Sequence, residues 1–422
     1  MFLAKRLNYD RKGYKKLYNN YSNSGRRSGG SSYKSNSRGS SGGNRSRGGF
    51  RRKPSNLDSR RFINTAVPIT AETTEAPQHS FADFNFHEQL ARNIEAKGYK
   101  TPTPIQDKVI KPLLAGNDLV GLANTGTGKT AAFMLPIIHG LVTNKKRNSA
   151  LVIAPTRELA HQVNEEFREF AKGMKLFSVV CVGGENIHRQ KSELRRGVNI
   201  IVGTPGRLKD LLEQGELKLH ETTTLVLDEA DQMLDMGFLP DMQFIMQAMP
   251  EEKQVICFSA TMTKEVTRLL DGIQNNAVLI STAAKVTSEH IDQNIIESGS
   301  KEQKVEKLVK LLAQPQFERV LIFGETKFGV QRLADDLTRK GHSAEAIHGN
   351  KSQSQRQRAL KSFKDAKVKV LVATDVAARG LDIPDVSLVV NFDQPQTYDT
   401  YIHRIGRTGR AGKGGTARTF VA

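Results

Sequence analysis

The strongest constraint in this sequence is a repeated alternation of short β-branched runs with longer segments of helical periodicity. From residue 81 onward the apolar runs are 118–123, 150–154, 177–182, 199–202, 224–227 and 254–258. After a polar stretch at 283–289 the rhythm resumes with 319–323, 344–347, 368–373, 387–391 and 416–421. Alternation of this kind predicts parallel sheets covered by helices on both faces. We therefore expect two doubly wound α/β domains in tandem, 81–282 and 291–422, joined by an interdomain linker at 283–290.

The N-terminal part of the chain has a different composition. Residues 1–61 hold 17 Lys and Arg and only two acidic residues, in a chain whose net charge is +19. Ser, Gly, Asn and Arg dominate residues 20–53, and such a composition cannot bury enough apolar surface to fold. We expect residues 1–80 to be a disordered basic tail and linker. Tyr residues among the cations favour binding of single-stranded nucleic acid, and a solubilising tail is the alternative.

The two cysteines and the absence of long apolar runs bear on the compartment. Cys181 and Cys257 both lie in apolar strand-like runs and lack metal-ligand spacing. We expect both to be buried and reduced, as in a cytoplasmic protein. No apolar run approaches the roughly 20 residues of a membrane span, so no membrane partner is expected. The Arg- and Ser-rich start leaves a transit peptide as the alternative location signal.

A glycine-rich segment, residues 123–130, follows the first predicted strand and opens a helix. Glycines let backbone N–H groups surround phosphate oxygens, and the helix N-terminus adds a favourable dipole. Lys129 would neutralise the β and γ phosphates, and the Thr130 hydroxyl would bind Mg²⁺. Ala123 stands where the usual pattern has Gly, and a purely structural turn is the alternative. The predicted nucleotide-binding residues of this loop are Thr125, Gly126, Thr127, Gly128, Lys129 and Thr130.

Two acidic residues follow the buried run 225–227. Asp228 would hold Mg²⁺ through water, and Glu229 would orient and deprotonate the attacking water. Carboxylates at this place can also serve only as a cap for the next helix. Beside a phosphate loop, the catalytic interpretation is favoured.

Asp228-Glu229-Ala230-Asp231 together with the phosphate loop resembles the signature of the DEAD-box RNA helicases of superfamily 2. The resemblance extends over residues 81–422 and implies two RecA-like domains. Ser259-Ala260-Thr261 is similar to the family's third motif, which links hydrolysis to RNA release, so Ser259, Thr261 and His403 would couple the two events. The resemblance also implies that RNA-contact residues of the first domain are Pro155, Thr156, Arg157, Gly184, Thr204, Pro205 and Arg207.

Residues 98–106 resemble the Q motif of the same family, with Phe81 lying 17 residues before Gly98. The Gln106 amide offers both a donor and an acceptor, so it would pair with N6 and N7 of adenine. The Tyr99 ring would stack on the base. The alternative is a Pro-rich loop in which Tyr99 and Phe81 are core residues.

The second predicted domain carries the remaining motifs. Residues 401–410 resemble the sixth motif, whose Arg407 and Arg410 would reach the γ-phosphate as arginine fingers. RNA phosphates are the alternative partners of these arginines. By resemblance to the fifth motif, Asp382 would bind the ribose hydroxyl, while Thr374 and Arg379 would serve RNA or the interdomain contact. Gln353 and Arg356 fit the QxxR element for RNA, and Phe323 fits the fourth motif or a buried strand.

These resemblances imply an RNA helicase that uses ATP and Mg²⁺. We expect RNA-stimulated ATP hydrolysis coupled to local, non-processive duplex unwinding or ribonucleoprotein remodelling. The RNA would be single-stranded or a short duplex with little sequence preference, and the protein would act as a monomer. The alternatives are an ATP-gated RNA clamp or annealing chaperone, and a DNA helicase. The family's second domain normally adds a helix after the strand at 416–421, so we expect that sheet to be partly uncovered or the chain to be truncated.

Overall fold

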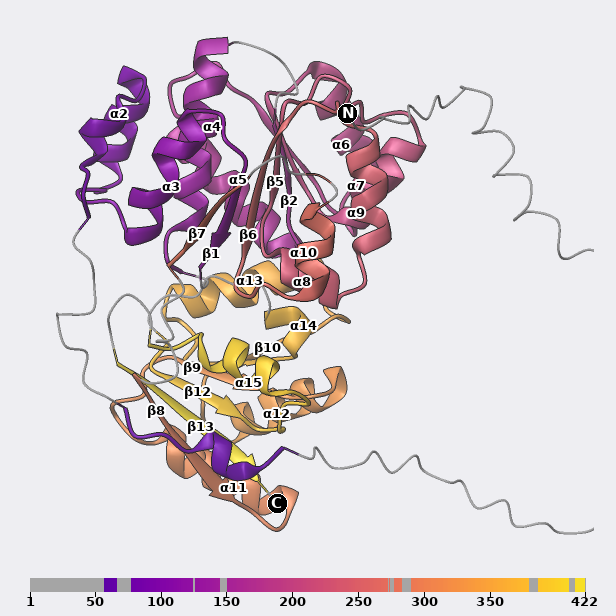
Figure 1. Ribbon diagram of the computed structural model, residues 1–422. Helices are drawn as coiled ribbons and strands as arrows, with labels where there is room; N and C mark the ends of the chain where they lie inside the picture. Colours follow the sequence, from indigo (N-terminus) through magenta and orange to yellow (C-terminus); the bar gives the residue numbers. More distant parts are fainter. Residues whose placement is uncertain are drawn as a thin grey trace, which may run out of the picture. The chain divides into compact units, whose positions relative to one another are not determined.

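A computed structural model describes residues 57–66, 77–123, 126–144, 150–271, 273, 277–282, 290–378, 386–409 and 414–421. Residues 54–422 form one compact unit that contains two α/β domains (Figure 1). Of the predicted tail and linker at 1–80, residues 1–56 and 67–76 lie outside the described residues, and so do residues 283–289 of the predicted interdomain linker at 283–290.

The first domain is built on a seven-stranded parallel sheet with the order β3-β4-β2-β5-β6-β1-β7. Its strands are β1 (Leu119–Leu122), β2 (Ala150–Ile153), β3 (Ser178–Cys181), β4 (Ile200–Gly203), β5 (Thr224–Leu227), β6 (Gln254–Ser259) and β7 (Val278–Ser281). The central strands β2, β4 and β5 are almost wholly buried, because helices cover both faces.

Helices of the first domain divide between the two faces of the sheet. The 3-10 helix η3 (Phe81–Phe84) precedes α2 (Glu88–Ala96), α3 (Pro104–Leu114), α4 (Lys129–Asn144) and α5 (Arg157–Phe170), and all of these pack in one apolar cluster. The opposite cluster contains α6 (Ile187–Arg196), α7 (Pro205–Glu213), α8 (Ala230–Asp235), α9 (Leu239–Gln247) and α10 (Lys264–Asp271). The sequence prediction of a doubly wound domain is confirmed.

The second domain has a six-stranded parallel sheet with the order β10-β11-β9-β12-β13-β8. Its strands are β8 (Ile291–Glu297), β9 (Val320–Phe323), β10 (Ala344–Ile347), β11 (Val370–Ala373), β12 (Leu388–Asn391) and β13 (Gly415–Val421). One face packs against α11 (Lys301–Leu312) and α12 (Lys327–Arg339), and the other against α13 (Gln353–Lys364), α14 (Asp375–Ala378) and α15 (Tyr398–Ile405). β7 and β8 are additional edge strands that the sequence analysis did not predict.

Threonine caps explain why several helices start directly after a strand and a short loop. Thr156, Thr326 and Thr397 each accept a hydrogen bond from a backbone N–H in the first turn of α5, α12 and α15. A cap of this kind satisfies a donor that has no partner within the helix. The caps therefore fix where each helix begins, at the same end of the sheet as the loops that follow the strands.

One segment differs from the expectation for the N-terminal tail and linker. Residues 57–64 contain the 3-10 helix η1 (Ser59–Phe62) and an antiparallel bridge from Asn64 to Gln293 in β8. They lie against β13 and β8 of the second domain (Figure 1). These residues from the N-terminal side cover part of the second sheet, at β8 and β13, a contact that the sequence analysis did not predict.

Cys181 and Cys257 are buried, free thiols, as predicted. Burial raises the pKa of Cys181 to about 12, and burial likewise raises the pKa of Cys257. Within the described ranges, no helix is long and apolar enough to cross a membrane.

Candidate functional site

The phosphate loop connects β1 to α4, the place that the sequence predicted. Gly126 and Gly128 have φ values of 85° and 90°, in the left-handed region that side chains rarely adopt. Lys129 is the first residue of α4 and is 6% exposed, and Thr130 follows it in the same turn. Thr125 lies outside the described residues. Two glycines, a lysine and a hydroxyl side chain therefore follow one another where the chain passes from β1 into α4.

Gln106 fastens the Q-motif helix α3 to this loop. Its Nε2 donates to the Gly128 carbonyl oxygen at 3.1 Å, and its Oε1 accepts from the Thr103 N–H at 2.9 Å. A Cβ on Gly128 would lie 2.6 Å from Nε2, so glycine is needed for this close approach. An amide carries two N–H donors and an oxygen with two lone pairs. One hydrogen and one lone pair therefore remain for the predicted pairing with adenine.

Tyr99 and Phe81 belong to one aromatic group beside α5. The Tyr99 ring centroid lies 5.9 Å from that of Phe81 and 5.5 Å from that of Phe170, in edge-to-face geometry. Both Tyr99 and Phe81 are half-buried against the core. The packing favours the structural interpretation of Phe81, whereas stacking of Tyr99 on a base stays a prediction.

The acidic pair stands at the end of β5. Asp228 is 2% exposed, and its N–H donates to the Ile153 carbonyl oxygen at 3.0 Å. Glu229 is 4% exposed and adopts φ 55° and ψ 52°, as the N-cap residue of α8. A left-handed conformation costs energy in a residue other than glycine, and such strain concentrates at functional sites. The strained turn holds two carboxylates together where the sheet ends.

Lys129 and Asp228 supply the electrostatic character of this region. Burial raises the pKa of Asp228 to about 6, with the Lys129 charge acting against the rise and the Glu229 charge adding to it. Lys129 Nζ and Asp228 Oδ1 are buried without a hydrogen-bond partner among the described residues. Burying polar groups unsatisfied is expensive, so their retention indicates a ligand. An ammonium group suits phosphate, and the oxygens of Asp228 and Thr130 suit a hard cation such as Mg²⁺.

Asp231 connects the acidic motif to the third motif, a role that the sequence analysis missed. Its Oδ2 accepts from the N–H of Ala260 at 3.1 Å, and from the N–H and hydroxyl of Thr261 at 3.0 Å each. The Ser259 hydroxyl donates to the Thr261 carbonyl oxygen at 2.7 Å. The loops after β5 and β6 are therefore one hydrogen-bonded unit. No spacing rule in the sequence would identify this partner.

The RNA residues predicted for the first domain gather at the ends of β2, β3 and β4. The Thr156 hydroxyl accepts from the Leu159 N–H at 3.2 Å and caps α5, with Pro155 just before it. Arg157 lies directly against Gly184, whose φ is 75°. A Cβ at Gly184 would lie 2.0 Å from Arg157 Nη1. Only glycine permits this approach.

The loop after β4 holds the other three predicted RNA residues. The Thr204 N–H donates to the Cys181 carbonyl oxygen at 3.0 Å, and Pro205 is the first residue of α7. Arg207 Nη1 donates to Gln190 Oε1 at 2.8 Å, so its guanidinium is tied to α6. The structure brings these residues to the same edge of the sheet as the phosphate loop, because parallel strands end on one side.

Gln353 and Arg356, the QxxR pair on α13, both contact Glu158 of α5. Gln353 Nε2 donates to Glu158 Oε1 at 3.1 Å, and Arg356 Nη2 lies 3.1 Å from Glu158 Oε2. The Glu158 side chain is only 3% exposed. Gln353 Oε1 and Arg356 Nε are buried without a hydrogen-bond partner among the described residues. Sequence reasoning assigned this pair to RNA and missed Glu158.

The arginines of the sixth motif occupy different environments. Arg404, 3% exposed, makes a two-pronged ion pair with Asp375, at 2.6 Å and 2.8 Å, and also donates to Asn391 Oδ1 and the Asp393 carbonyl oxygen. The Arg404 guanidinium thus makes these hydrogen bonds within the second domain. Arg407 is 5% exposed just beyond α15.

Other residues predicted for the second domain vary in what the structure describes. His403 is half-buried on α15, and Thr374 directly follows β11. Arg379, Asp382 and Arg410 lie outside the described residues.

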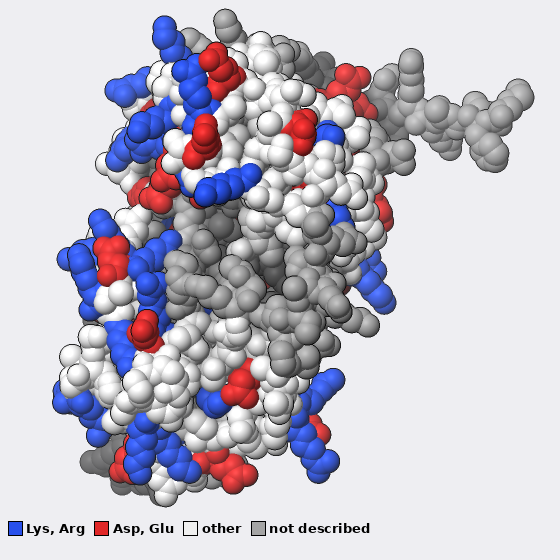
Figure 2. Space-filling view, turned by 90° about the vertical axis from the view of Figure 1, so that its left-hand side faces the viewer, with Lys and Arg blue, Asp and Glu red and all other residues white. Residues whose placement is uncertain are grey.

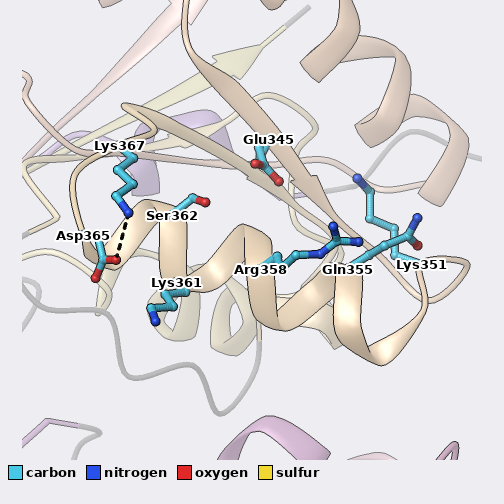
Figure 3. A pocket seen from close by; sticks show the side chains of 8 residues that line it. All are labelled: Glu345, Lys351, Gln355, Arg358, Lys361, Ser362, Asp365 and Lys367. Atoms are coloured by element: carbon cyan, nitrogen blue, oxygen red, sulfur yellow. Dashed lines mark ion pairs between the residues drawn. The ribbon is translucent and has the colours of Figure 1, made fainter.

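A shallow hollow of about 330 Å³ lies on the second domain beside α13 (Figure 3). Residues of both charges line it: Glu345, Lys351, Gln355, Arg358, Lys361, Ser362, Asp365 and Lys367. Helical periodicity places Gln355 and Arg358 on the side of α13 opposite Gln353 and Arg356. The hollow contains none of the predicted functional residues.

Two family models match most of the folded part of the chain. The model described as DEAD/DEAH box helicase matches residues 103–269. The model for the helicase conserved C-terminal domain matches residues 303–412. The two matches correspond to the two domains of the structure.

Curated relatives and solved structures agree with these matches. ATP-dependent RNA helicase CshA of Listeria monocytogenes is 45% identical over 342 residues, covering 81% of this chain and 66% of the relative. The chain thus spans about two thirds of the length of that relative. DEAD-box ATP-dependent RNA helicase CshA of Geobacillus kaustophilus is 44% identical over 343 residues, covering 81% of this chain and 73% of the relative.

Among solved structures, S. cerevisiae Dbp5 bound to RNA and ADP BeF3 superposes with a TM-score of 0.73 at 33% identity. That match covers 81% of this chain and 89% of Dbp5. Mss116p bound to ssRNA and AMP-PNP gives a TM-score of 0.74 at 30% identity, covering 85% of this chain and 77% of that one. The two domains therefore have the RecA-like fold of these helicase structures.

Proposed function

Because this chain belongs to the DEAD/DEAH-box helicase family, we propose that it is an RNA helicase that hydrolyses ATP. RNA stimulates the hydrolysis, and its energy drives local, non-processive duplex unwinding or ribonucleoprotein remodelling. The observation that carries the proposal is the pair of buried groups, Lys129 Nζ and Asp228 Oδ1, beside the strained Glu229. A buried cation and carboxylates at the end of a phosphate loop suit a nucleotide with its metal.

The first domain holds the nucleotide and activates water. Lys129 and the loop N–H groups bind the β and γ phosphates, while Thr130 and, through water, Asp228 would hold Mg²⁺. Bound Mg²⁺ neutralises charge on the phosphates. Glu229, whose backbone is left-handed, accepts a proton from the attacking water. Gln106, already fixed to Gly128, selects adenine.

The second domain completes the reaction. Arg407 and Arg410 stabilise charge on the γ-phosphate in the transition state, Asp382 binds the ribose, and Tyr99 stacks on the base. Splitting the catalytic groups between two domains makes hydrolysis depend on their apposition, which RNA favours. Asp231, through Thr261 and Ser259, relays the state of the acidic motif to the loop after β6, and His403 acts with this unit.

RNA binds along the loops after β2, β3 and β4 and along the second domain. Its contacts are with phosphate and 2′-OH groups, so sequence preference is low. The residues proposed to bind it are Pro155, Thr156, Arg157, Gly184, Thr204, Pro205, Arg207, Gln353, Arg356 and Thr374. The similarity to Dbp5 and Mss116p, both solved with RNA and an ATP analogue, supports this assignment. We also propose that the protein works as a monomer in the cytoplasm. This reducing compartment suits its free, buried thiols.

Glu229→Gln tests the function most directly. The variant keeps the shape of the side chain but cannot accept the proton, so ATP binding persists while turnover falls by about 10² or more. Glu251→Gln, an exposed position in the same domain, serves as the matched control. Steady-state hydrolysis by Glu229→Gln at the wild-type rate would reject Glu229 as the base.

The nucleic-acid specificity needs a separate comparison. ATPase rates measured with RNA and with DNA of the same sequence distinguish an RNA helicase from a DNA helicase. A fluorescent duplex-release assay distinguishes unwinding from the second candidate, an ATP-gated clamp or annealing chaperone. Hydrolysis without any strand release would favour that candidate.

A further inference from the structure

Residues 57–64, here called the N-terminal clip, bind the second domain although more than 200 residues separate them from β8 in sequence. They precede the first domain in the chain, and nothing in the proposed catalytic machinery involves them. Phe62 is 0% exposed, whereas the adjacent Ile63 is 50% exposed. Of these two neighbours, Phe62 is therefore the side chain that packs into the second domain.

Phe62 is the apolar anchor of the N-terminal clip. Its ring centroid lies 4.6 Å from that of Tyr401, which is also 0% exposed. The two rings share one buried cluster with residues of β8, α15 and β13, namely Ile291, Ile405, Ala417 and Val421. A phenylalanine buried to this extent is among the largest single contributions a side chain makes to packing.

Polar contacts fix the register of the N-terminal clip on the edge strand β8. The N–H of Asn64 donates to the Gln293 carbonyl oxygen at 2.9 Å, and the reciprocal bond is 2.8 Å. Asn64 Nδ2 also donates to the Ile291 carbonyl oxygen at 3.2 Å. On its other side β8 pairs with β13, so the N-terminal clip satisfies the edge that the sheet leaves open.

The same contacts converge on α15. The Tyr401 hydroxyl donates to Gln293 Oε1 at 2.9 Å. Gln293, whose backbone pairs with Asn64, is therefore also hydrogen-bonded to α15. The Arg61 guanidinium lies 4.8 Å from the centroid of the Tyr398 ring, within the range of a cation–π contact. α15 thus rests on the N-terminal clip at two of its aromatic residues.

α15 carries Arg404 and leads directly into Arg407. One turn after Tyr401 in the same helix, Arg404 is held by its ion pair with Asp375. Arg407, one turn further, is placed by the orientation of α15. We propose that the N-terminal clip is a built-in part of the second domain and that Phe62 is a positioning residue for Arg407. This inference rests on the proposed function of Arg407 in ATP hydrolysis.

Hydrogen exchange of the full chain tests whether the N-terminal clip supports α15. Phe62→Ala removes the anchor, so we expect backbone amides of α15 and β8 to exchange at least about tenfold faster than in the wild type. Ile63→Ala, which truncates the exposed neighbour, should leave them unchanged. Unchanged exchange of α15 in Phe62→Ala would overturn the proposal.

ATPase kinetics of the same proteins test positioning. Because Arg407 acts in the transition state, Phe62→Ala should lower kcat by about tenfold with little change in the KM for ATP. Ile63→Ala should match the wild type, and Phe62→Leu, which keeps an apolar anchor, should recover most of the rate. Faster exchange with an unchanged kcat would also overturn the proposal.

Two further comparisons separate a local effect on α15 from unfolding of the domain and from loss of ATPase activity. If Phe62→Ala also accelerates exchange in the central strands β9 and β11, the same measurements are made on Arg61→Ala, which removes only the Tyr398 contact. If the wild type itself hydrolyses no ATP, the proposed function fails. The exchange comparison of Phe62→Ala with Ile63→Ala then still decides whether the N-terminal clip holds α15.

Discussion

At the scale of single residues, the site is defined by charges that the protein buries without satisfying. Lys129 Nζ and Asp228 Oδ1 have no hydrogen-bond partner among the described residues, although an ordinary core would pair them. Glu229, which follows Asp228 and caps the start of α8, has a left-handed backbone conformation. These features reduce stability, and a protein retains them where a ligand compensates the charge. Stability and catalysis should therefore respond in opposite directions when Asp228 is neutralised.

Asp228→Asn should stabilise the protein and abolish ATP hydrolysis. Burial raises the pKa of Asp228 from 3.8 to about 6. The folded state then binds its proton more tightly than the unfolded state, so stability is lost as pH rises through about 6 and is fully present below about 4. The asparagine variant escapes this loss. We expect a gain of about 1–3 kcal/mol at pH 8 that disappears near pH 4.

Thermal unfolding midpoints measured from pH 4 to pH 8 check the sign. Asp271→Asn, at an exposed position of the same domain, is the matched control and should show no such trend. A variant at Asp228 that is less stable than the wild type at pH 8 would contradict the burial argument.

Sequence identified the residues of the phosphate loop and the acidic pair because their chemistry depends on neighbours along the chain. Lys129 opens the helix that follows β1, and Asp228 directly follows β5. Asp231 and Glu158 were missed because their partners, Thr261 and Arg356, are distant in sequence. A carboxylate whose partner is supplied by another loop has no local signature.

At the scale of elements, each parallel sheet places the loops that follow its strands at the same edge, where the strands end. Buried strands such as β5 and β12 were predicted because they are continuous apolar runs. β7, with alternate residues exposed, and β8, which contains Asp292, Gln293 and Asn294, lack that signal. Both are edge strands of their sheets. An edge strand pairs with only one neighbouring strand of the sheet, so more of its side chains can be polar and exposed. The N-terminal clip escaped prediction because one buried phenylalanine cannot be distinguished within a basic segment.

The loop after β3 illustrates how an element constrains a predicted RNA contact. Gly184 combines a φ of 75° with the close approach of Arg157, so Gly184→Ala must displace either the loop or the guanidinium. We expect RNA affinity to fall about tenfold, a loss of roughly 1.4 kcal/mol, while ATP binding without RNA is unchanged. Fluorescence anisotropy with labelled RNA and with labelled ATP provides the two measurements.

Gly140→Ala is the matched control, because a Cβ at that helical position would meet nothing within 4 Å. It should bind RNA as the wild type does. Equal RNA affinity for Gly184→Ala and Gly140→Ala would remove the loop after β3 from the RNA surface.

At the scale of the whole molecule, charge is distributed very unevenly. Residues 62–422 contain 46 Lys and Arg and 42 Asp and Glu, and on the face drawn in Figure 2 the two signs are interspersed. Residues 1–53 contain 15 Lys and Arg and a single acidic residue. Mixed charge suits selective contacts within loops, whereas the excess of cations favours any polyanion. The N-terminal clip comes after these residues in the sequence and contacts the second domain.

Removing residues 1–53 should therefore weaken RNA binding without disturbing catalysis at saturating RNA. Each cation that neutralises a phosphate releases a counterion, so the slope of log affinity against log salt should fall by about 0.7 for every single-strand phosphate that the deletion leaves unneutralised. The deletion keeps the N-terminal clip, and a longer deletion of residues 1–64 removes it. We expect both truncations to share the flatter salt dependence and only the longer one to lower kcat. An unchanged slope in either truncation would show that residues 1–53 act as a spacer, because counterion release reports directly on phosphate neutralisation.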